Sequence, residues 1–251
     1  MKRIVFLAFM LIAFTACTNS EEIAPSKTFQ GTIVSFAAAG RVFDGASFVL
    51  LDDGNLWGWG SNNNSRISPH DDVHLAPVMI LDDVSSFSVM SDHVAAIRTD
   101  GSLWTWGSNS SGQLGDGTIT AQVEPQRIME GVAYVAAGIS HTMAITNDGV
   151  LWGWGSNEYG QIGVGHTGAQ IVPARVLDDV ISVSVGTVSS AAIRRDGSLW
   201  TWGVITVVSL AMAPQTEVFI PSRLWKMWLR FLLEAITPWL SQMTACCGVG
   251  A

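Results

Sequence analysis

The sequence predicts an all-β fold, a β-propeller with about four repeats in frame and a tail that departs from the pattern. Three observations predict it: one eight-residue motif recurs, it recurs at a fixed spacing, and the residues between the copies have almost no helical periodicity. The first residues of the copies lie 47, 48 and 48 residues apart. A period near fifty residues is typical of a propeller or solenoid, in which each repeat buries its apolar face against its neighbours. The copies occupy residues 53–60, 100–107, 148–155 and 196–203.

Each copy has the form Asp-Gly-x-Leu-Trp-x-Trp-Gly, which predicts a β-hairpin. Asp and Gly tolerate the positive φ angles that a two-residue hairpin turn requires. Ala95 to Ile97 before the turn and Leu103 to Trp106 after it predict the two strands. Because side chains alternate across a strand, Trp104 and Trp106 share one face. Their strict recurrence predicts that the tryptophans pack between repeats; a platform for stacking sugars or bases is the alternative.

The residues between two hairpins predict further strands. A long loop rich in Asn, Ser and Gly follows each of the first three hairpins and runs on to a proline. After that proline comes a short apolar run such as Ala174 to Leu177, then Asp-Val or Gly-Val, then another run such as Tyr134 to Gly138. The first repeat begins with Ile33 to Gly40 and Ala46 to Leu51. Four short strands per repeat are the pattern of a propeller blade, and the repeats together span residues 32–203.

Three motifs in fixed order carry a family resemblance. They are Gly-Gln-Leu-Gly-Asp-Gly-Thr at 112–118, Ala-Ala-Gly-x-x-His-Thr-x-Ala-Ile at 136–145, and the hairpin motif. Together they resemble the regulator of chromosome condensation repeat family. That resemblance implies a β-propeller, typically seven-bladed, and bacterial members of the family are often exported. Residues 66–68 and the corners at 92–94 and 188–190 depart from the motifs. Nothing resembles the surface with which the eukaryotic namesake exchanges nucleotide on a small GTPase, so that activity is not carried over.

The N-terminal residues predict export and anchoring. Two basic residues precede an apolar run from Ile4 to Phe14, which indicates a secretory signal over residues 1–16 and is too short for a comfortable membrane span. A small residue directly before Cys17 resembles the bacterial lipoprotein signal, although Phe14 stands where Leu is usual. We therefore expect Cys17 to be lipidated and residues 17–31 to tether the chain to the cell envelope. The alternative is an ordinary cleaved signal with an incidental cysteine.

Composition narrows the class of partner. Of the 251 residues, 48% are hydrophobic and 14% are charged, with a formal net charge of −8. This balance gives no basic field to hold nucleic acid, so we expect no nucleic-acid partner.

After Gly203 the pattern stops, and residues 204–251 need a separate explanation. Taken at face value, Arg223 to Glu234 predicts an amphipathic or interfacial helix. The genetic code offers another account. If each true codon starts at the third base of the preceding one, residues 236–240 can encode His-Thr-Met-Ala and residues 208–213 can encode Gln-Leu-Gly-Asp-Gly. Both peptides match residues of the second and third repeats at a displacement of 96 residues, two periods of 48. We interpret the tail as a fifth repeat translated out of frame after the loss of one G near codon 203.

No catalytic constellation emerges from the sequence, so we expect no enzyme and no cofactor. The best metal-like cluster is His70-Asp71-Asp72-Val73-His74, and a polar loop in a decayed repeat is the simpler interpretation. His141 has no carboxylate partner placed by spacing, which favours a hydrogen-bonded structural residue over a general base. In an out-of-frame tail Cys246-Cys247 is no redox or metal pair, which leaves Cys17 as the one candidate site residue.

We expect an exported, lipid-anchored propeller that binds a protein or a glycan through the loops of adjacent blades. Propellers carry such sites on loop faces while the strands scaffold them. One alternative is a secreted enzyme that acts on cell-wall or other polysaccharide, with acids such as Asp116 and Glu158 converging at the central channel. The residue one period after Asp116 is Val164, so that acid does not recur. The other alternative is a non-functional fragment of a frameshifted gene.

Overall fold

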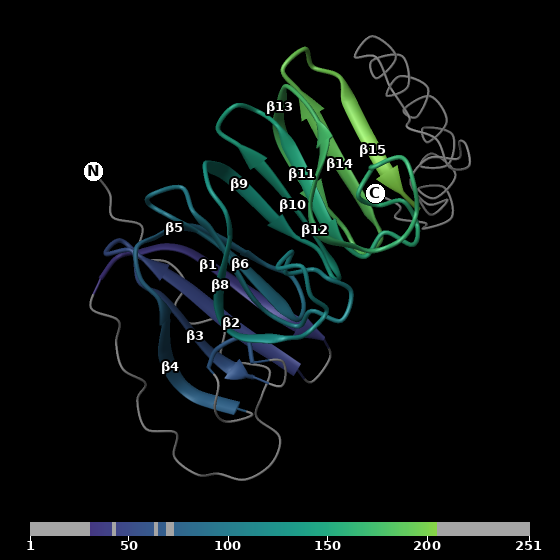
Figure 1. The fold of residues 1–251 in the computed structure, drawn as a ribbon. Coiled ribbons are helices and arrows are strands. Elements are labelled where there is room, and N and C mark those ends of the chain that lie inside the picture. The colour runs from purple at the N-terminus through teal and green to yellow at the C-terminus, as the bar shows by residue number, and fades with distance from the viewer. Residues whose placement is uncertain (1–30, 42–43, 63–64, 69–72, 205–251) are drawn as a thin grey trace, which may run out of the picture.

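The computed structural model describes residues 31–41, 44–62, 65–68 and 73–204, and the regular secondary structure of this part is all β-strand. Within these residues, fifteen strands form four antiparallel sheets, which we call blades 1 to 4 in chain order (Figure 1). Blade 1 contains β1 (Ile33–Arg41), β2 (Asp44–Leu51), β3 (Leu56–Ser61) and β4 (Val73–Leu81). Blade 2 contains β5 (Val84–Val89), β6 (His93–Arg98), β7 (Leu103–Gly107) and β8 (Gln122–Met129). Blade 3 contains β9 (Val132–Ala137), β10 (His141–Thr146), β11 (Leu151–Gly155) and β12 (Gln170–Leu177). Blade 4 contains β13 (Val180–Val185), β14 (Ser189–Arg194) and β15 (Leu199–Gly203).

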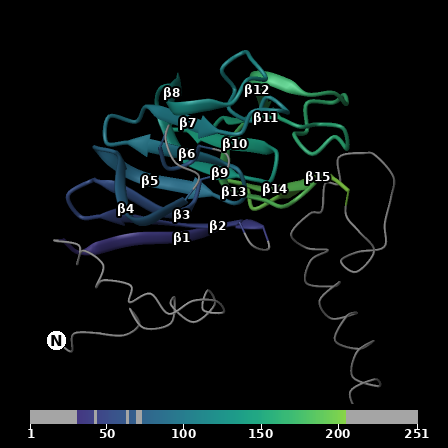
Figure 2. The same ribbon diagram turned by 90° about the horizontal axis from the view of Figure 1, so that it is seen from below.

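Strands that follow one another in the chain are neighbours in each sheet. The first strands β1, β5, β9 and β13 contact one another from blade to blade and so form the inner side. The fourth strands β4, β8 and β12 lie outermost, and Figure 2 shows β8 and β12 outside β5, β9 and β13. The blades follow one another from the purple to the green end of the chain (Figure 1), as the blades of a propeller do. The predicted all-β propeller class is confirmed.

The Asp-Gly hairpins form because the aspartate caps its own turn. In blade 2, the Asp100 carboxylate accepts hydrogen bonds from the backbone N–H of Ser102 at 2.8 Å and from its hydroxyl at 2.6 Å. Gly101 has a φ of 80°, a region that favours glycine. The same contacts recur in blade 4 between Asp196 and Ser198. The hairpin prediction is therefore confirmed together with its physical basis.

A turn with positive φ joins each blade to the next. Gly131 has a φ of 67°, and the equivalent Asp83 and Asp179 have φ angles of 54° and 58°. The following residue donates its backbone N–H to the preceding hairpin, as Val132 does to the Gly101 carbonyl at 2.9 Å. Glycine and aspartate are among the residues that tolerate this conformation. This explains the Asp-Val and Gly-Val pairs that recur in the sequence.

The hydrophobic core lies in the seams between consecutive blades. Trp106, Trp154 and Trp202, the second tryptophans of their motif copies, are buried between their own blade and the one before it. The indole N–H of Trp106 donates to the Arg66 carbonyl at 2.8 Å, and that of Trp154 donates to the Gln113 carbonyl at 2.9 Å. Each of these two tryptophans thus ties its blade to the loop of the preceding blade, which confirms the predicted packing role.

In the described part, blade 1 and blade 4 each have one side that packs against no other blade. Side chains on these two sides are exposed, whereas the equivalent side chains between two blades are buried. Ile145, between blades 3 and 4, is 5% exposed, whereas Ile193 at the same place in blade 4 is 40% exposed. Val135, on the side of blade 3 that faces blade 2, is 5% exposed, whereas Phe36 on the corresponding side of blade 1 is 71% exposed. Within the described residues the ring of blades is not closed, as predicted for an incomplete propeller.

The outer strands begin earlier than the sequence predicts. β12 starts at Gln170 and includes Pro173, whereas the sequence predicts a strand from Ala174 onward. β8 includes Pro125 in the same way. Proline has no N–H to donate, so within a sheet it is confined largely to edge strands. Both strands lie at the edges of their sheets, where the missing donor breaks no ladder on the outer side.

Several expectations concern residues outside the described part. They are the signal over residues 1–16, the tether from Cys17 to residue 30, and the tail after residue 204. Across the part of the chain that the structure describes, no helix has the length and apolar character needed to span a membrane.

Candidate binding site

Buried hydrogen bonds cross the seams between blades 2, 3 and 4. Nε2 of His93 lies 2.8 Å from the Thr142 hydroxyl, and Nε2 of His141 lies 2.9 Å from the Ser190 hydroxyl. The Thr142 hydroxyl donates to the Gln113 carbonyl at 2.8 Å. Because that hydroxyl has one proton, Nε2 of His93 is the donor to Thr142. Both histidines and both hydroxyl side chains are buried.

The seam between blades 1 and 2 uses an apolar pair at the same place. Ala46 in blade 1 takes the position of His93 in blade 2, since each lies opposite the last glycine of its hairpin motif. Val94 takes the position of Thr142, and Ala46 and Val94 belong to one buried cluster. Each seam therefore holds either a histidine hydrogen-bonded to a hydroxyl or two apolar side chains.

Burial keeps the two histidines neutral. It lowers the pKa of His93 to about 3, with a smaller contribution from the neighbouring His141. Burial also lowers the pKa of His141 to about 4, against a backbone hydrogen bond with Ser189 that raises it. A fully buried neutral imidazole cannot reach a substrate in solvent. The predicted structural role of His141 is confirmed.

A buried asparagine organises each long loop. Asn109 and Asn157 are fully buried, and each accepts through Oδ1 a hydrogen bond of 3.0 Å, from the backbone N–H of Leu114 and Ile162 respectively. The side-chain amide of Asn109 also donates to the Thr118 carbonyl at 3.1 Å. These bonds join the start of the loop to its end and fix the loop backbone.

Asp116 is committed to its own loop. Its carboxylate accepts hydrogen bonds from the backbone N–H of Thr118 at 2.9 Å and from the Gln122 amide at 2.9 Å. The Asn109 amide donates to it at 3.1 Å. In the described part of the chain, no hydrogen bond or ion pair joins Asp116 to Glu158. These contacts do not support the alternative in which the two acids act together as catalytic groups.

Residues 108–121 of blade 2 and 156–169 of blade 3 form what we call the loop face. The Gly117 N–H donates to a carbonyl of β12 at 2.9 Å, which ties the first loop to the outer strand of the next blade. On this face Ile119 and Tyr159 are 65% and 55% exposed. Apolar and aromatic side chains that are held on a fixed backbone and open to solvent are suited to contact a partner protein.

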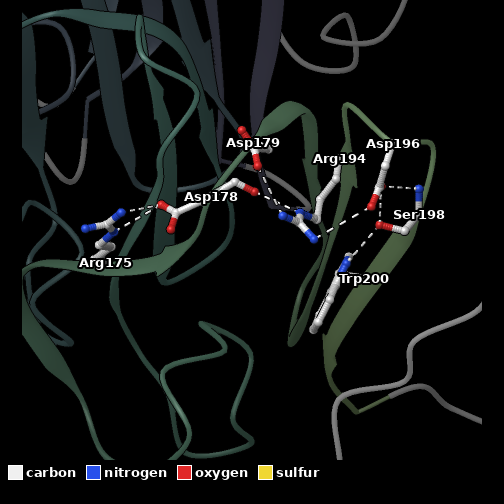
Figure 3. A network of polar contacts seen from close by, with 7 residues as sticks. All are labelled: Arg175, Asp178, Asp179, Arg194, Asp196, Ser198 and Trp200. Atoms are coloured by element: carbon white, nitrogen blue, oxygen red, sulfur yellow. Dashed lines mark hydrogen bonds and ion pairs between the residues drawn. The ribbon is translucent and has the colours of Figure 1, made fainter.

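The opposite side of the blades, which we call the hairpin face, carries charges that pair with one another (Figure 3). Arg194 donates to the Asp178 carbonyl at 2.9 Å and lies 3.3 Å from the Asp179 carboxylate. Its guanidinium also lies 3.7 Å from the Asp196 carboxylate, and Arg175 pairs with Asp178 at 2.6 Å. Such exposed pairs each contribute little to stability. The network orders the turns and leaves these charges engaged with one another.

The structure describes part of the metal-like cluster predicted at residues 70–74. His74 lies on β4, and its Nε2 is 2.8 Å from the Ser68 hydroxyl. Among the described residues, no group of three or more His, Cys, Asp or Glu side chains is placed to hold a metal ion. Cys17, the predicted lipidation site, lies outside the described part.

Comparison of the sequence with protein families identifies the repeat. A profile described as Regulator of chromosome condensation (RCC1) repeat matches residues 100–145 and 148–193. A second profile with the same description matches residues 84–113 and 132–161. Residues 84–193 match RCC1 repeats. The matches at 100–145 and 148–193 run from one hairpin to the next, so one RCC1 repeat holds the last strands of a blade and the first strands of the following blade.

Solved structures share the fold. Human WBSCR16 is 24% identical with a TM-score of 0.61, over 70% of this chain and 48% of that one. Prp20p from Saccharomyces cerevisiae is 21% identical with a TM-score of 0.62, over 76% of this chain and 52% of that one. The chain thus spans about half the length of these two structures. Comparison with curated protein sequences gives no match.

The contacts across the seams of the RCC1 repeats join residues far apart in the chain and have little local signal in the sequence. By its sequence the corner at 92–94 departs from the motif, yet His93 makes the same contact as His141. The signal is a hydroxyl residue 49 positions after each histidine, one period of 48 plus one. The buried Asn109 and Asn157 lie one period apart in loops that share the pattern Ser-Asn-x-x-Gly-Gln-aliphatic-Gly, and this recurrence is their signal in the sequence.

Proposed function

We propose that this RCC1-repeat chain is a protein-binding scaffold that contacts its partner through the loop face. The observation that carries the proposal is the exposure of Ile119 and Tyr159 on loops that the buried Asn109 and Asn157 hold in place. A fixed loop loses little conformational entropy on binding, so its exposed side chains contribute more to affinity. The proposal includes no catalytic step.

The structural comparisons support a protein as the class of ligand. One Prp20p structure is described together with its binding to Gsp1p and histones, and another shows Kap60 bound to Prp20. Those partners belong to Prp20p. What supports the proposal is that a protein of the same fold binds other proteins; the partner of this chain is a separate question.

The binding test compares the two faces of the blades. Proteins captured from the cell envelope by the full chain are identified, and each is then titrated against two variants. Ile119→Ser with Tyr159→Ser is expected to weaken binding at least ~10-fold, because exposed apolar anchors dominate interface energies. Arg127→Ser with Glu130→Ser, which removes an exposed ion pair of the hairpin face, is the matched control and is expected to bind like the parent.

Two outcomes would overturn this assignment. Equal binding by both double variants would place the interface elsewhere on the molecule. Binding of purified envelope polysaccharide, with no captured protein that titrates, would make the ligand a glycan.

We further propose that a lipid on Cys17 holds the chain at the cell envelope. The support is the sequence alone, an apolar signal that ends in a small residue and cysteine. Cells that express the full chain and are fed an alkyne-labelled fatty acid are expected to label it, whereas Cys17→Ala is expected to be unlabelled and to leave the membrane fraction. Labelling that survives Cys17→Ala would contradict lipidation at this residue.

A further inference from the structure

A pocket opens on the hairpin face where blade 2 joins blade 3. It has a volume of about 360 Å³, and its walls include Glu130 at the junction of the two blades, Thr146 and Asp148 at the hairpin, and Trp152 on β11. Trp152 is the first tryptophan of its motif copy and packs partly buried against the core of the seam. The pocket therefore combines an aromatic ring with two carboxylates, and it lies apart from the loop face.

In blade 2 an arginine of the chain itself fills the equivalent place. Arg98, the last residue of β6, lies one period of 48 before Thr146, the last residue of β10. Its guanidinium lies over the ring of Trp104, the counterpart of Trp152, with the central carbon 4.6 Å from the ring centroid. It also donates to the Asp82 carboxylate at 2.7 Å. A cation over an indole is attracted by the negative face of the ring.

Blade 4 also has an arginine at this place. Arg194 lies one period after Thr146, and its guanidinium is 3.3 Å from the Asp179 carboxylate. The same guanidinium is 3.7 Å from the Asp196 carboxylate, and Figure 3 shows Arg194 between the two aspartates. The side chains of Arg98 and Arg194 are each 26% exposed, so both are largely covered. In both blades the hairpin end therefore holds a guanidinium against carboxylates.

Blade 3 keeps most of the surroundings of this arginine and lacks the arginine itself. Thr146 has a much shorter side chain, and its hydroxyl donates to the Asp148 carboxylate. Asp148 and Glu130 stand at the places of two of the aspartates that hold the arginines in blades 2 and 4. One carboxylate is lost, since Gly131 takes the place of an aspartate at the other two junctions. The pocket therefore corresponds to the space that an arginine side chain occupies in the neighbouring blades.

The charge of the pocket wall favours a cation. A side-chain hydrogen bond lowers the pKa of Asp148 most, and the charge of Arg175 lowers it further, so this carboxylate is ionised at neutral pH. Arg175 pairs with Asp178 at 2.6 Å, and Arg127 pairs with Glu130 at 3.1 Å. Both arginines are exposed, and neither lines the pocket. A cationic group that enters the pocket therefore gains the attraction of Asp148.

We propose that the pocket formed by Trp152, Asp148 and Glu130 binds an arginine side chain of a protein ligand. The guanidinium stacks on Trp152 and pairs with a carboxylate, as that of Arg98 does within blade 2. Arginine is favoured over lysine, because a planar guanidinium can stack on an indole and donate to a carboxylate at the same time. This ligand is separate from the partner of the loop face, so either proposal can fail while the other stands.

A peptide titration followed by nuclear magnetic resonance tests the pocket. The full chain, labelled with nitrogen-15, is titrated with the peptide acetyl-Gly-Gly-Arg-Gly-Gly-amide. The expected result is a saturable shift of the Trp152 indole N–H and of the amides of residues 146–148. The same peptide with citrulline, the neutral isostere of arginine, is expected to bind at least ~10-fold more weakly, and the peptide with lysine at least ~3-fold more weakly.

Two variants with matched controls assign the binding to the pocket. Thr146→Arg gives blade 3 the arginine that blades 2 and 4 contain, and is expected to abolish binding while the chain stays folded. Thr99→Arg adds the same charge at an exposed position outside the pocket and is expected to bind like the parent. Asp148→Asn keeps a side-chain acceptor for the turn but removes its charge, and is expected to weaken binding at least ~3-fold. Asp196→Asn, the same change in blade 4, is expected to leave binding unchanged.

The proposal is wrong if the arginine peptide shifts neither Trp152 nor residues 146–148. Equal binding of the citrulline peptide, or parent-like binding by a folded Thr146→Arg chain, overturns it as well. If Thr146→Arg does not fold, the comparison of Asp148→Asn with Asp196→Asn decides, and equal affinities overturn the proposal. An envelope oligosaccharide that produces these shifts when the arginine peptide does not would make the pocket a sugar site instead.

Discussion

His141 and Ser190 meet across the seam between blades 3 and 4, where their exposed fractions are 0% and 3%. Ala46 and Val94 fill the corresponding place between blades 1 and 2. A buried polar group that loses its partner costs about 1–3 kcal/mol, whereas replacing both partners by apolar groups is close to neutral. At the residue scale, a seam is therefore expected to tolerate a matched pair of changes better than either change alone.

A double-mutant cycle at the seam between blades 3 and 4 tests this expectation. His141→Ala removes the partner of Ser190 and leaves a cavity, and is expected to lower the free energy of unfolding by ~2–4 kcal/mol. Ser190→Val leaves Nε2 of His141 without its partner and is expected to lower it by ~1–3 kcal/mol. The double variant reproduces the Ala46–Val94 pair and is expected to lose less than the sum. Urea denaturation measures all three, and a double-variant loss equal to the sum would contradict the paired role.

Acid is expected to destabilise the fold through the same histidines. In the folded chain their pKa values are about 3 and about 4, below the 6.5 of free histidine, so the unfolded chain takes up protons first as the pH falls. The free energy of unfolding is therefore highest above about pH 7, where both histidines are neutral in the folded and the unfolded chain. It declines as the pH falls from about 6.5 toward about 4, by up to ~1.4 kcal/mol per pH unit for each histidine. Urea midpoints between pH 8 and pH 4.5 measure the slope. A slope that His141→Ala leaves unchanged would contradict this origin.

At the scale of the element, the long loops of blades 2 and 3 each place a glycine against the tryptophan of the next blade. A Cβ on Gly115 would lie 2.8 Å from the Trp154 ring, and one on Gly163 would lie 2.5 Å from the Trp202 ring. Both glycines also have positive φ, 77° and 85°. Glycine is therefore favoured at these positions for two reasons, the positive φ angle and the close approach of the tryptophan ring.

Alanine substitutions separate these two demands. Gly165 has a φ of 79°, and no described atom lies within 4 Å of a Cβ built on it, so Gly165→Ala introduces backbone strain alone. We expect it to lower the free energy of unfolding by ~1–2 kcal/mol. Gly163→Ala adds the clash with Trp202 and is expected to lose a further ~1–3 kcal/mol. Thermal or urea unfolding of both variants measures the difference, and equal losses would mean that the contact with Trp202 is not tight.

The elements that the sequence predicts well are those that depend on neighbouring residues. The Asp100-Gly101 turn contains both the capping aspartate and the glycine that adopts a positive φ, so its hairpin can be predicted from a few residues. The start of β12 is harder to predict from the sequence. Pro173 can lie inside this strand only because the strand is the outermost one of its sheet. The contact from His93 to Thr142 joins residues 49 apart and depends on how two blades pack, which no local pattern contains.

At the scale of the whole molecule, stability is distributed among blades and seams. Blades 2 and 3 are covered on both sides, whereas blades 1 and 4 each have one open face in the described part, marked by the exposure of Phe36 and Ile193. In arrays of repeats the total is roughly a sum of repeat and nearest-neighbour terms. Repairing one damaged loop should therefore stabilise its own blade without a change elsewhere.

A loop graft tests that additivity and the out-of-frame interpretation together. Replacing residues 204–213 with a copy of residues 156–165 restores the asparagine and the glycine that the loops of blades 2 and 3 contain. We expect a higher urea midpoint than that of the parent chain, because the grafted loop can fold on blade 4 as its counterpart does on blade 3. The same ten residues in scrambled order are the control. Equal midpoints for the graft and the scrambled control would contradict the interpretation.

Native-state hydrogen exchange across residues 31–204 tests most directly whether the seams between blades hold the molecule together. If they do, amides of β6, β7, β10 and β11, in the two blades covered on both sides, exchange most slowly, and those of β14 and β15 exchange faster. The pattern of slow amides should also repeat with the period of 48 residues. Slowest exchange in blades 1 and 4, or no periodicity, would contradict the structure described for these repeats.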